Sequence, residues 1–247
     1  MNPLTVLSAD EIKSIHESSL AVLREVGVEL PHPEVLKILA DAGAQVDFDK
    51  NVARLPERMV EDALQKCGKK YIVYGRDRTR SARFGYGDFV LVSTAGQYSW
   101  VDEDGGTRRD ASKEDLTKAI VVNDALENIN IVGGMAMPYD VPTAVRDVYT
   151  AAELVKGTAK PFHLWVANGT SLPYILEILE TAAGGKDEHH RHPMITAFVE
   201  PISPLRFPRT GLEILLGCAA EGLPVGFGPM AQSGASAPVT LAGTLVV

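Results

Sequence analysis

Residues 194–247, MITAFVEPISPLRFPRTGLEILLGCAAEGLPVGFGPMAQSGASAPVTLAGTLVV, decide the fold of this chain. Two short apolar runs, 194–199 and 223–227, flank a stretch, 210–221, whose leucines recur at helical spacing. Neither run alternates polar with apolar residues, so we expect both to be parallel strands covered by helices. A right-handed crossover would then make 194–199 and 223–227 neighbours in one sheet.

The same strand–helix pattern extends toward the N-terminus as far as residue 112. A helix is expected to begin at Ser112, because Asp115 lies three residues later in a capping-box pattern. Two strands and two helices follow, with Ser171 as the expected cap of the second helix, and Pro238 opens a further helix. The expected strands are 130–132 and 161–167, and the expected helices are 143–156 and 171–183. We therefore predict a β/α domain over residues 112–247.

Residues 1–111 have a different pattern, which predicts a helical and β-hairpin region. Amphipathic helices are expected from the Ser8–Glu11 capping box to Gly27, from Pro33 to Gly43, and from Pro56 to Gly68. The following segment is rich in β-formers, and a turn at 104–106 is expected to close a hairpin. Its expected strands are 71–74, 89–92 and 98–101. Four arginines nearby either contact an acidic partner or lie on a solvated face; they are Arg76, Arg78, Arg80 and Arg83.

Composition excludes several classes of protein. The 247 residues carry a formal charge of −8, which argues against nucleic acid or an anionic membrane as the main partner. Cys67 and Cys218 have no metal-ligand spacing and are expected to be buried thiols in a reducing cytoplasm. Neither a signal peptide nor an apolar run of bilayer length occurs in the sequence. We expect a cytoplasmic, soluble protein.

Three segments carry a resemblance to a known family: PISPLRF with GLPVGFGPMAQSGASAPVTLAG, DVPTAVRDVYTAAELVKGTAKPFH, and LSADEIKSIHESSLAVLREVGVEL. Together they resemble the trimethylamine methyltransferase family over nearly the whole chain. The resemblance implies an α/β fold of the (β/α)8 TIM-barrel type. Because family members continue for roughly as many residues again, it implies an incomplete barrel here, with about four β/α units.

The resemblance also implies an activity. Family members transfer a methyl group from a tertiary or quaternary methylamine, such as trimethylamine or glycine betaine, to a Co(I) corrinoid. That corrinoid (cobalamin) is supplied by a separate carrier protein, so no cofactor is expected to be bound by this chain itself. A homo-oligomer is expected as well. The alternative is a truncated, non-catalytic fragment that acts only as a binding or assembly module. The position occupied by pyrrolysine in archaeal members would lie beyond Val247, which leaves the identity of the amine open.

Candidate substrate-binding residues follow from strand ends. Asn168, Glu200, Gln232 and Ser233 each come after the last apolar residues of an expected strand, where parallel α/β folds build their sites. Glu200 shares strand parity with Thr196 and Phe198 and is therefore expected to face the barrel mouth. Structural alternatives remain for each residue. Glu200 can bond turn amides, Asn168 can cap the turn before Ser171, and the Gly-rich loop at 232–233 can serve folding alone.

Further candidates lie outside the strand ends. Thr94 and Gln97 are candidates for a lid over the site. Aromatic faces at Tyr98, Trp100 and Trp165, or the carboxylate of Glu200, can hold a methylated cation, although core packing also explains each aromatic residue. The histidine-rich run at 189–192 is expected to be a solvated loop, not a metal site. No nucleophile, phosphate-loop or metal-ligand motif occurs in the sequence, so we assign no catalytic residue.

Overall fold

The computed structural model describes residues 5–103 and 105–246, which form two compact units. Unit 1 comprises Met1–Gly68, Glu200–Leu212 and Phe227–Val247. Unit 2 comprises Lys69–Val199 and Glu213–Gly226. The division into 1–111 and 112–247 that the sequence suggests stays a prediction.

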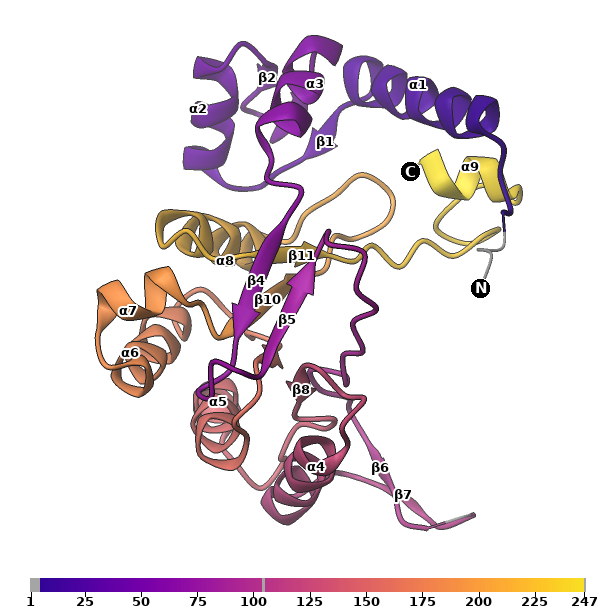
Figure 1. The fold of residues 1–247 in the computed structure, drawn as a ribbon. Helices are drawn as coiled ribbons and strands as arrows, with labels where there is room; N and C mark the ends of the chain where they lie inside the picture. The colour runs from indigo at the N-terminus through magenta and orange to yellow at the C-terminus, as the bar shows by residue number, and fades with distance from the viewer. Residues whose placement is uncertain (1–4, 104, 247) are drawn as a thin grey trace. The chain divides into compact units, whose positions relative to one another are not determined.

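Unit 2 is built on a four-stranded sheet, and Figure 1 labels three of its strands, β8, β10 and β11. Its strands are β8 (Val132–Gly133), β9 (Phe162–Leu164), β10 (Ile195–Val199) and β11 (Val225–Phe227). The order in the sheet is β11-β10-β9-β8, and β9 pairs in parallel with both β8 and β10. The predicted adjacency of residues 194–199 and 223–227 is confirmed, as is the α/β class.

Helices follow the strands along the chain. They are α4 (Lys113–Ala125), α5 (Arg146–Gly157, after a 3-10 turn at Thr143–Val145), α6 (Leu172–Ala183), α7 (Lys186–Arg191) and α8 (Arg209–Ala220). In unit 2, α4 packs on β8 and α5 packs on β9, between α4 and α6. The capping box that Ser112 forms with Asp115 is confirmed. The prediction of a loop at 189–192 was wrong, because His189 lies in α7 with its side chain buried.

One further segment lies beside β8 in the parallel direction. The strand predicted at 89–92 forms only a single parallel bridge, between Val92 and Ile131. Backbone hydrogen bonds continue from that bridge, with Ser93 N donating to Ile131 O at 3.0 Å and Met135 N to Thr94 O at 3.0 Å. We call residues 91–97 the edge segment. Its connection through α4 to β8 adds one more β/α step to the sheet.

Two hairpins complete unit 2. Strand β4 (Tyr71–Tyr74) pairs antiparallel with β5 (Ser81–Phe84), a strand that the sequence pattern does not reveal. Strand β6 (Trp100–Val101) pairs with β7 (Arg108–Arg109), and this hairpin projects beyond α4 (Figure 1). The turn predicted at 104–106 includes Asp104, which lies outside the described residues. Each of the four nearby arginines has a partner within the chain: Arg76 with Thr158 O, Arg78 with Glu188, Arg80 with Asp124, and Arg83 with Asp88.

Unit 1 combines short strands with helices. It contains α1 (Ala9–Glu25), β1 (Val28–Glu29), α2 (Pro33–Asp41), β2 (Gln45–Asp47), β3 (Val52–Arg54), α3 (Glu57–Lys66) and α9 (Leu241–Val246). The predicted capping box at Ser8 and Glu11 is confirmed. The sheet β1-β3-β2 was not predicted, because strands of two or three residues show no periodicity. The core of unit 1 gathers Val28, Leu30, Leu36 and Ala53 around Leu212, which comes from α8.

The loop that follows β10 is held against β1. Glu29 N donates to Leu205 O at 2.9 Å, and Phe207 N donates to Glu29 O at 3.0 Å. An ion pair between Arg206 Nε and Glu29 Oε1, 3.3 Å apart, lies beside these bonds. The segment PISPLRF is therefore ordered by a strand that lies more than 170 residues earlier in the chain.

The two cysteines differ from one another. Cys218 is buried as predicted, and burial raises the pKa of its thiol to about 11. The prediction was wrong for Cys67, which is exposed at the C-terminal cap of α3. Within the described ranges, no helix is long and apolar enough to cross a membrane.

Candidate functional site

Strands β9 and β10 sort their side chains onto two faces of the sheet. Phe162, Leu164, Ile195 and Ala197 are each 1% exposed. The next residue along the chain after each of these four points to the opposite face of the sheet and is partly exposed. These partly exposed residues are His163, Trp165, Thr196 and Phe198. We call these four residues, together with Tyr98, the aromatic face.

His163 contacts two other residues of the aromatic face, Phe198 and Thr196. Its ring meets that of Phe198 edge-on, with centroids 5.8 Å apart and planes at 75°. Its Nδ1 lies 2.9 Å from Thr196 Oγ1 and 3.1 Å from Thr196 O on the neighbouring strand. Burial lowers the pKa of the imidazole. A neutral ring is therefore the dominant form near pH 7.

Trp165 and Tyr98 form a corner at the carboxyl end of β9. Their ring centroids are 6.0 Å apart and their planes stand at 80°. Tyr98 directly follows the edge segment and is exposed, whereas Trp165 is partly buried. Two perpendicular rings offer π-faces in two directions, a geometry that suits an organic cation. Trp100, the third aromatic candidate, lies instead on the β6–β7 hairpin.

Thr94 and Gln97 lie together on the edge segment. Gln97 Nε2 donates to Thr94 Oγ1 at 3.3 Å, and the Gln97 backbone bonds Met135 and Met137. Because both residues belong to a backbone that is hydrogen-bonded along β8 and its extension, this geometry favours a fixed wall over a movable lid. The structure places them at the carboxyl edge of the sheet, where Tyr98 also emerges.

Asn168 lies at the end of the loop after β9 and caps the next turn. Its Oδ1 accepts hydrogen bonds from Ser171 N at 3.1 Å, from Ser171 Oγ at 3.3 Å and from Thr170 Oγ1. Ser171 occupies the N-cap of α6 but makes no side-chain cap bond there, and the Asn168 oxygen instead closes the turn that precedes the helix. This is the structural alternative for Asn168, and its contact with a ligand stays a prediction.

The remaining candidates belong to unit 1. Glu200 is exposed at the start of the loop held by β1. Gln232 O accepts from three backbone amides, those of Ala235, Ser236 and Ala237, each at 3.0 Å. Ser233 Oγ donates to Pro238 O at 3.1 Å, so residues 232–238 close on themselves. For all three candidates, contact with a ligand stays a prediction.

His163 was missed as a candidate by sequence reasoning. The signal was present, because His163 has the same strand parity as Trp165 in the run PFHLWVAN. What the run cannot reveal is the partner of the ring, since Thr196 lies 33 residues later and reaches His163 only through the pairing of β9 with β10.

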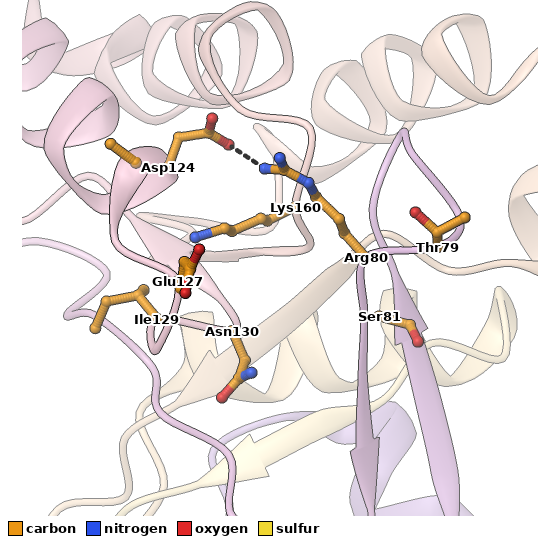
Figure 2. A pocket seen from close by; sticks show the side chains of 9 residues that line it. Thr79, Arg80, Ser81, Asp124, Glu127, Ile129, Asn130 and Lys160 are labelled. Carbon is orange, nitrogen blue, oxygen red and sulfur yellow. Dashed lines mark ion pairs between the residues drawn. The ribbon is translucent and has the colours of Figure 1, made fainter.

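A polar cavity of about 500 Å³ lies at the start of β9, near the end of α4. Figure 2 shows Arg80 reaching from the β4–β5 hairpin to Asp124 on α4, at 3.6 Å. The side chain of Lys160 donates to the carbonyl oxygens of Asn123 and Leu126, at 3.0 and 2.7 Å, and thereby caps α4. Because these charged groups bind the backbone or one another, we assign the cavity a structural role.

Metal-ligand groupings of three or more His, Cys, Asp or Glu do not occur among residues 5–103 and 105–246. The histidine-rich run belongs to the scaffold. His189 is 1% exposed, and burial, reinforced by the charge of His190, lowers its pKa to about 4. A histidine in this position stays uncharged at neutral pH.

The chain is similar to known proteins over nearly its whole length. The profile of the trimethylamine methyltransferase (MTTB) family matches residues 1–247. A trimethylamine methyltransferase of Methanosarcina barkeri is 30% identical over 256 residues, covering 98% of this chain and 50% of the relative. One of Desulfitobacterium hafniense is 29% identical over 98% of this chain and 49% of its own length. A glycine betaine methyltransferase of Desulfitobacterium hafniense is 25% identical over 97% of this chain. The chain spans about half the length of the curated relatives it matches.

Proposed function

Because the chain belongs to the trimethylamine methyltransferase family, we propose that it supplies the amine-binding part of a methyltransferase. The methyl donor is a tertiary or quaternary methylamine, and the acceptor is the Co(I) corrinoid of a separate carrier protein. Relatives named for trimethylamine and for glycine betaine support this class of substrate. The corrinoid is then a second substrate, which the carrier protein brings.

The aromatic face is the observation that carries the proposal. The corner of Tyr98 and Trp165, with centroids 6.0 Å apart, presents ring faces at the carboxyl edge of a parallel sheet. Such faces attract a methylated ammonium by about 0.5 to 2 kcal/mol per ring, more when water is excluded. Carboxyl edges of parallel sheets are also where α/β folds build their sites.

The chemistry asks for positioning of the amine. When the C–N bond breaks, its electron pair passes to nitrogen, a neutral amine leaves, and the methyl group passes to the Co(I) acceptor. A quaternary ammonium needs no proton for this step, and a protonated tertiary ammonium already carries the proton it needs. The residues of this chain therefore have to desolvate the cation and aim its N–CH₃ bond.

We further propose that the sheet of unit 2 is part of a (β/α)8 barrel. The order β11-β10-β9-β8, with the edge segment beyond β8, supplies consecutive parallel elements joined by α4, α5 and the later helices. The aliphatic face lies under helices, and the aromatic face would then line the barrel interior.

Binding of methylated amines tests the proposal. In calorimetric titrations, the protein is expected to bind trimethylammonium and glycine betaine, and Trp165→Leu is expected to weaken binding by roughly 3- to 30-fold, because one ring face is lost. Trp100→Leu is the matched control, since the chain's other tryptophan lies on the β6–β7 hairpin. Absence of binding by the wild-type protein, or equal loss in both variants, would contradict the proposal. Amine-dependent methylation of a Co(I) corrinoid on its carrier protein then tests turnover.

A further inference from the structure

The contacts of the His163 imidazole favour one tautomer. Its Nδ1 lies within hydrogen-bond distance of two oxygens of Thr196, the backbone carbonyl at 3.1 Å and the hydroxyl at 2.9 Å. A carbonyl oxygen can only accept, so its contact with Nδ1 favours the neutral tautomer that carries the proton on Nδ1. The other nitrogen, Nε2, then carries a lone pair and acts as an acceptor.

That lone pair lies on the aromatic face. Nε2 is the ring nitrogen farther from the backbone, and His163 projects from β9 on the same side as Trp165, two residues later. Two residues along a strand span about 6.6 Å, so a cation held against Trp165 lies within reach of the imidazole. Phe198 packs edge-on against the imidazole.

We propose that His163 is a specificity-determining residue for the amine: its Nε2 accepts a hydrogen bond from the single N–H of a protonated tertiary ammonium, such as trimethylammonium. A quaternary ammonium has no N–H to donate and meets the same site through its methyl groups alone. The inference rests on the proposed function and deepens it, because it distinguishes between the two classes of substrate.

The low basicity of the ring suits this role. Trimethylamine is a better methyl donor as the ammonium, because dimethylamine can then leave as a neutral molecule that keeps the proton. A basic acceptor would remove that proton and leave a poor leaving group behind. Burial lowers the pKa of His163, so the ring binds the N–H without taking the proton.

Paired ligands test the inference. Trimethylammonium and tetramethylammonium differ by the replacement of one N–H by one N–CH₃, so calorimetric titration with both isolates the hydrogen bond. His163→Phe keeps an aromatic ring against Phe198 and removes the acceptor. We expect it to weaken trimethylammonium binding by about 10- to 100-fold, the range of a hydrogen bond to a charged group, and tetramethylammonium binding by less than about 2-fold.

The conservative variant provides rescue. His163→Gln places an amide oxygen near the position of Nε2, so it is expected to recover most of the affinity for trimethylammonium. Melting curves of both variants show whether each is folded. Equal weakening for the two ligands, or no weakening for either, would overturn the role of His163. Failure of the wild-type protein to bind either ligand would instead overturn the proposed function, and the inference with it.

Discussion

At the scale of single residues, Gly133 sets how closely the edge segment approaches β8. A Cβ at this position would lie 2.0 Å from Thr94 O and 2.5 Å from Thr94 C, which are backbone atoms. The amide of Gly133 also donates to Ser93 Oγ at 2.6 Å within the buried interior. Because the backbone at Thr94 cannot yield as a side chain can, any larger residue must push the edge segment away from the sheet.

We therefore expect Gly133→Ala to lower the free energy of unfolding by about 1–3 kcal/mol, through overpacking. Amine affinity should fall as well, since Tyr98 directly follows the displaced segment. Gly96→Ala is the matched control, because the nearest atom to its Cβ is Met137 Cγ at 3.1 Å, part of a flexible side chain. Denaturant unfolding and calorimetry measure the two effects. Equal destabilisation by both substitutions would show that the close approach at Gly133 is not limiting.

At the scale of elements, Arg109 fastens the β6–β7 hairpin to α4. Its guanidinium donates to both oxygens of Asp115, at 2.7 and 3.0 Å, and to both oxygens of Asp102, at 2.7 Å each. The side chain of Asp115 is 2% exposed and that of Asp102 is 48% exposed. The Arg109 guanidinium therefore makes one buried and one solvated ion pair. We expect the buried pair to contribute more to the free energy of unfolding.

Asp115→Asn is expected to reduce the free energy of unfolding by about 2–3 kcal/mol, because charge-assisted bonds to Arg109 and the capping box are weakened together. Asp102→Asn should lower the free energy of unfolding by less than about 1 kcal/mol, as is usual for exposed ion pairs. The Arg109 guanidinium holds the pKa of Asp115 well below its usual range. This stabilisation is fully present above the unfolded pKa, about 3.9, and is lost progressively as the pH falls from there through the lower pKa of the folded state. Chemical denaturation at several pH values tests both points, and equal costs for the two variants would refute the argument from burial.

At the scale of the whole molecule, the described sheet has an edge strand. Strand β11 has a neighbour on one side only among the described strands, and its last residue, Phe227, is 49% exposed. Unpaired strand edges with apolar residues tend to pair with other chains. Expressed alone, residues 1–247 are therefore expected to associate, with a mean mass in sedimentation or light scattering that rises with concentration.

Phe227→Lys should reduce this association, since a charge on an edge strand opposes pairing. A melting curve must accompany the variant, because Phe227 also meets the ring of Phe207 at 5.9 Å. A wild-type chain that stays monomeric at every concentration would contradict the prediction. The homo-oligomer and the non-catalytic fragment suggested by the sequence both stay predictions, and this measurement bears on the first of them.

Local signals allowed much of the fold to be predicted. The capping boxes at Ser8 and Ser112 depend on residues three positions apart, so they can be read directly from the chain. The strand–helix–strand pattern at 194–227 also depends on neighbouring residues, and it correctly predicted that β10 and β11 are adjacent. The family resemblance rests on segments that are contiguous in the chain.

Long-range pairing settled what these signals left open. The edge segment is ordered by hydrogen bonds to residues 131–137, and β5 by β4, although neither has a clear period of its own. The side-chain oxygen of Asn168 closes the turn before α6, and the contact with Thr196 favours one tautomer of His163. The strand parity that placed Trp165 and His163 on one face was legible in the sequence. The contacts of these two residues with Tyr98 and Thr196 could not be predicted from the sequence. Such hydrogen bonds and ring contacts join residues that are distant in the chain, and a sequence pattern does not record which distant residues meet.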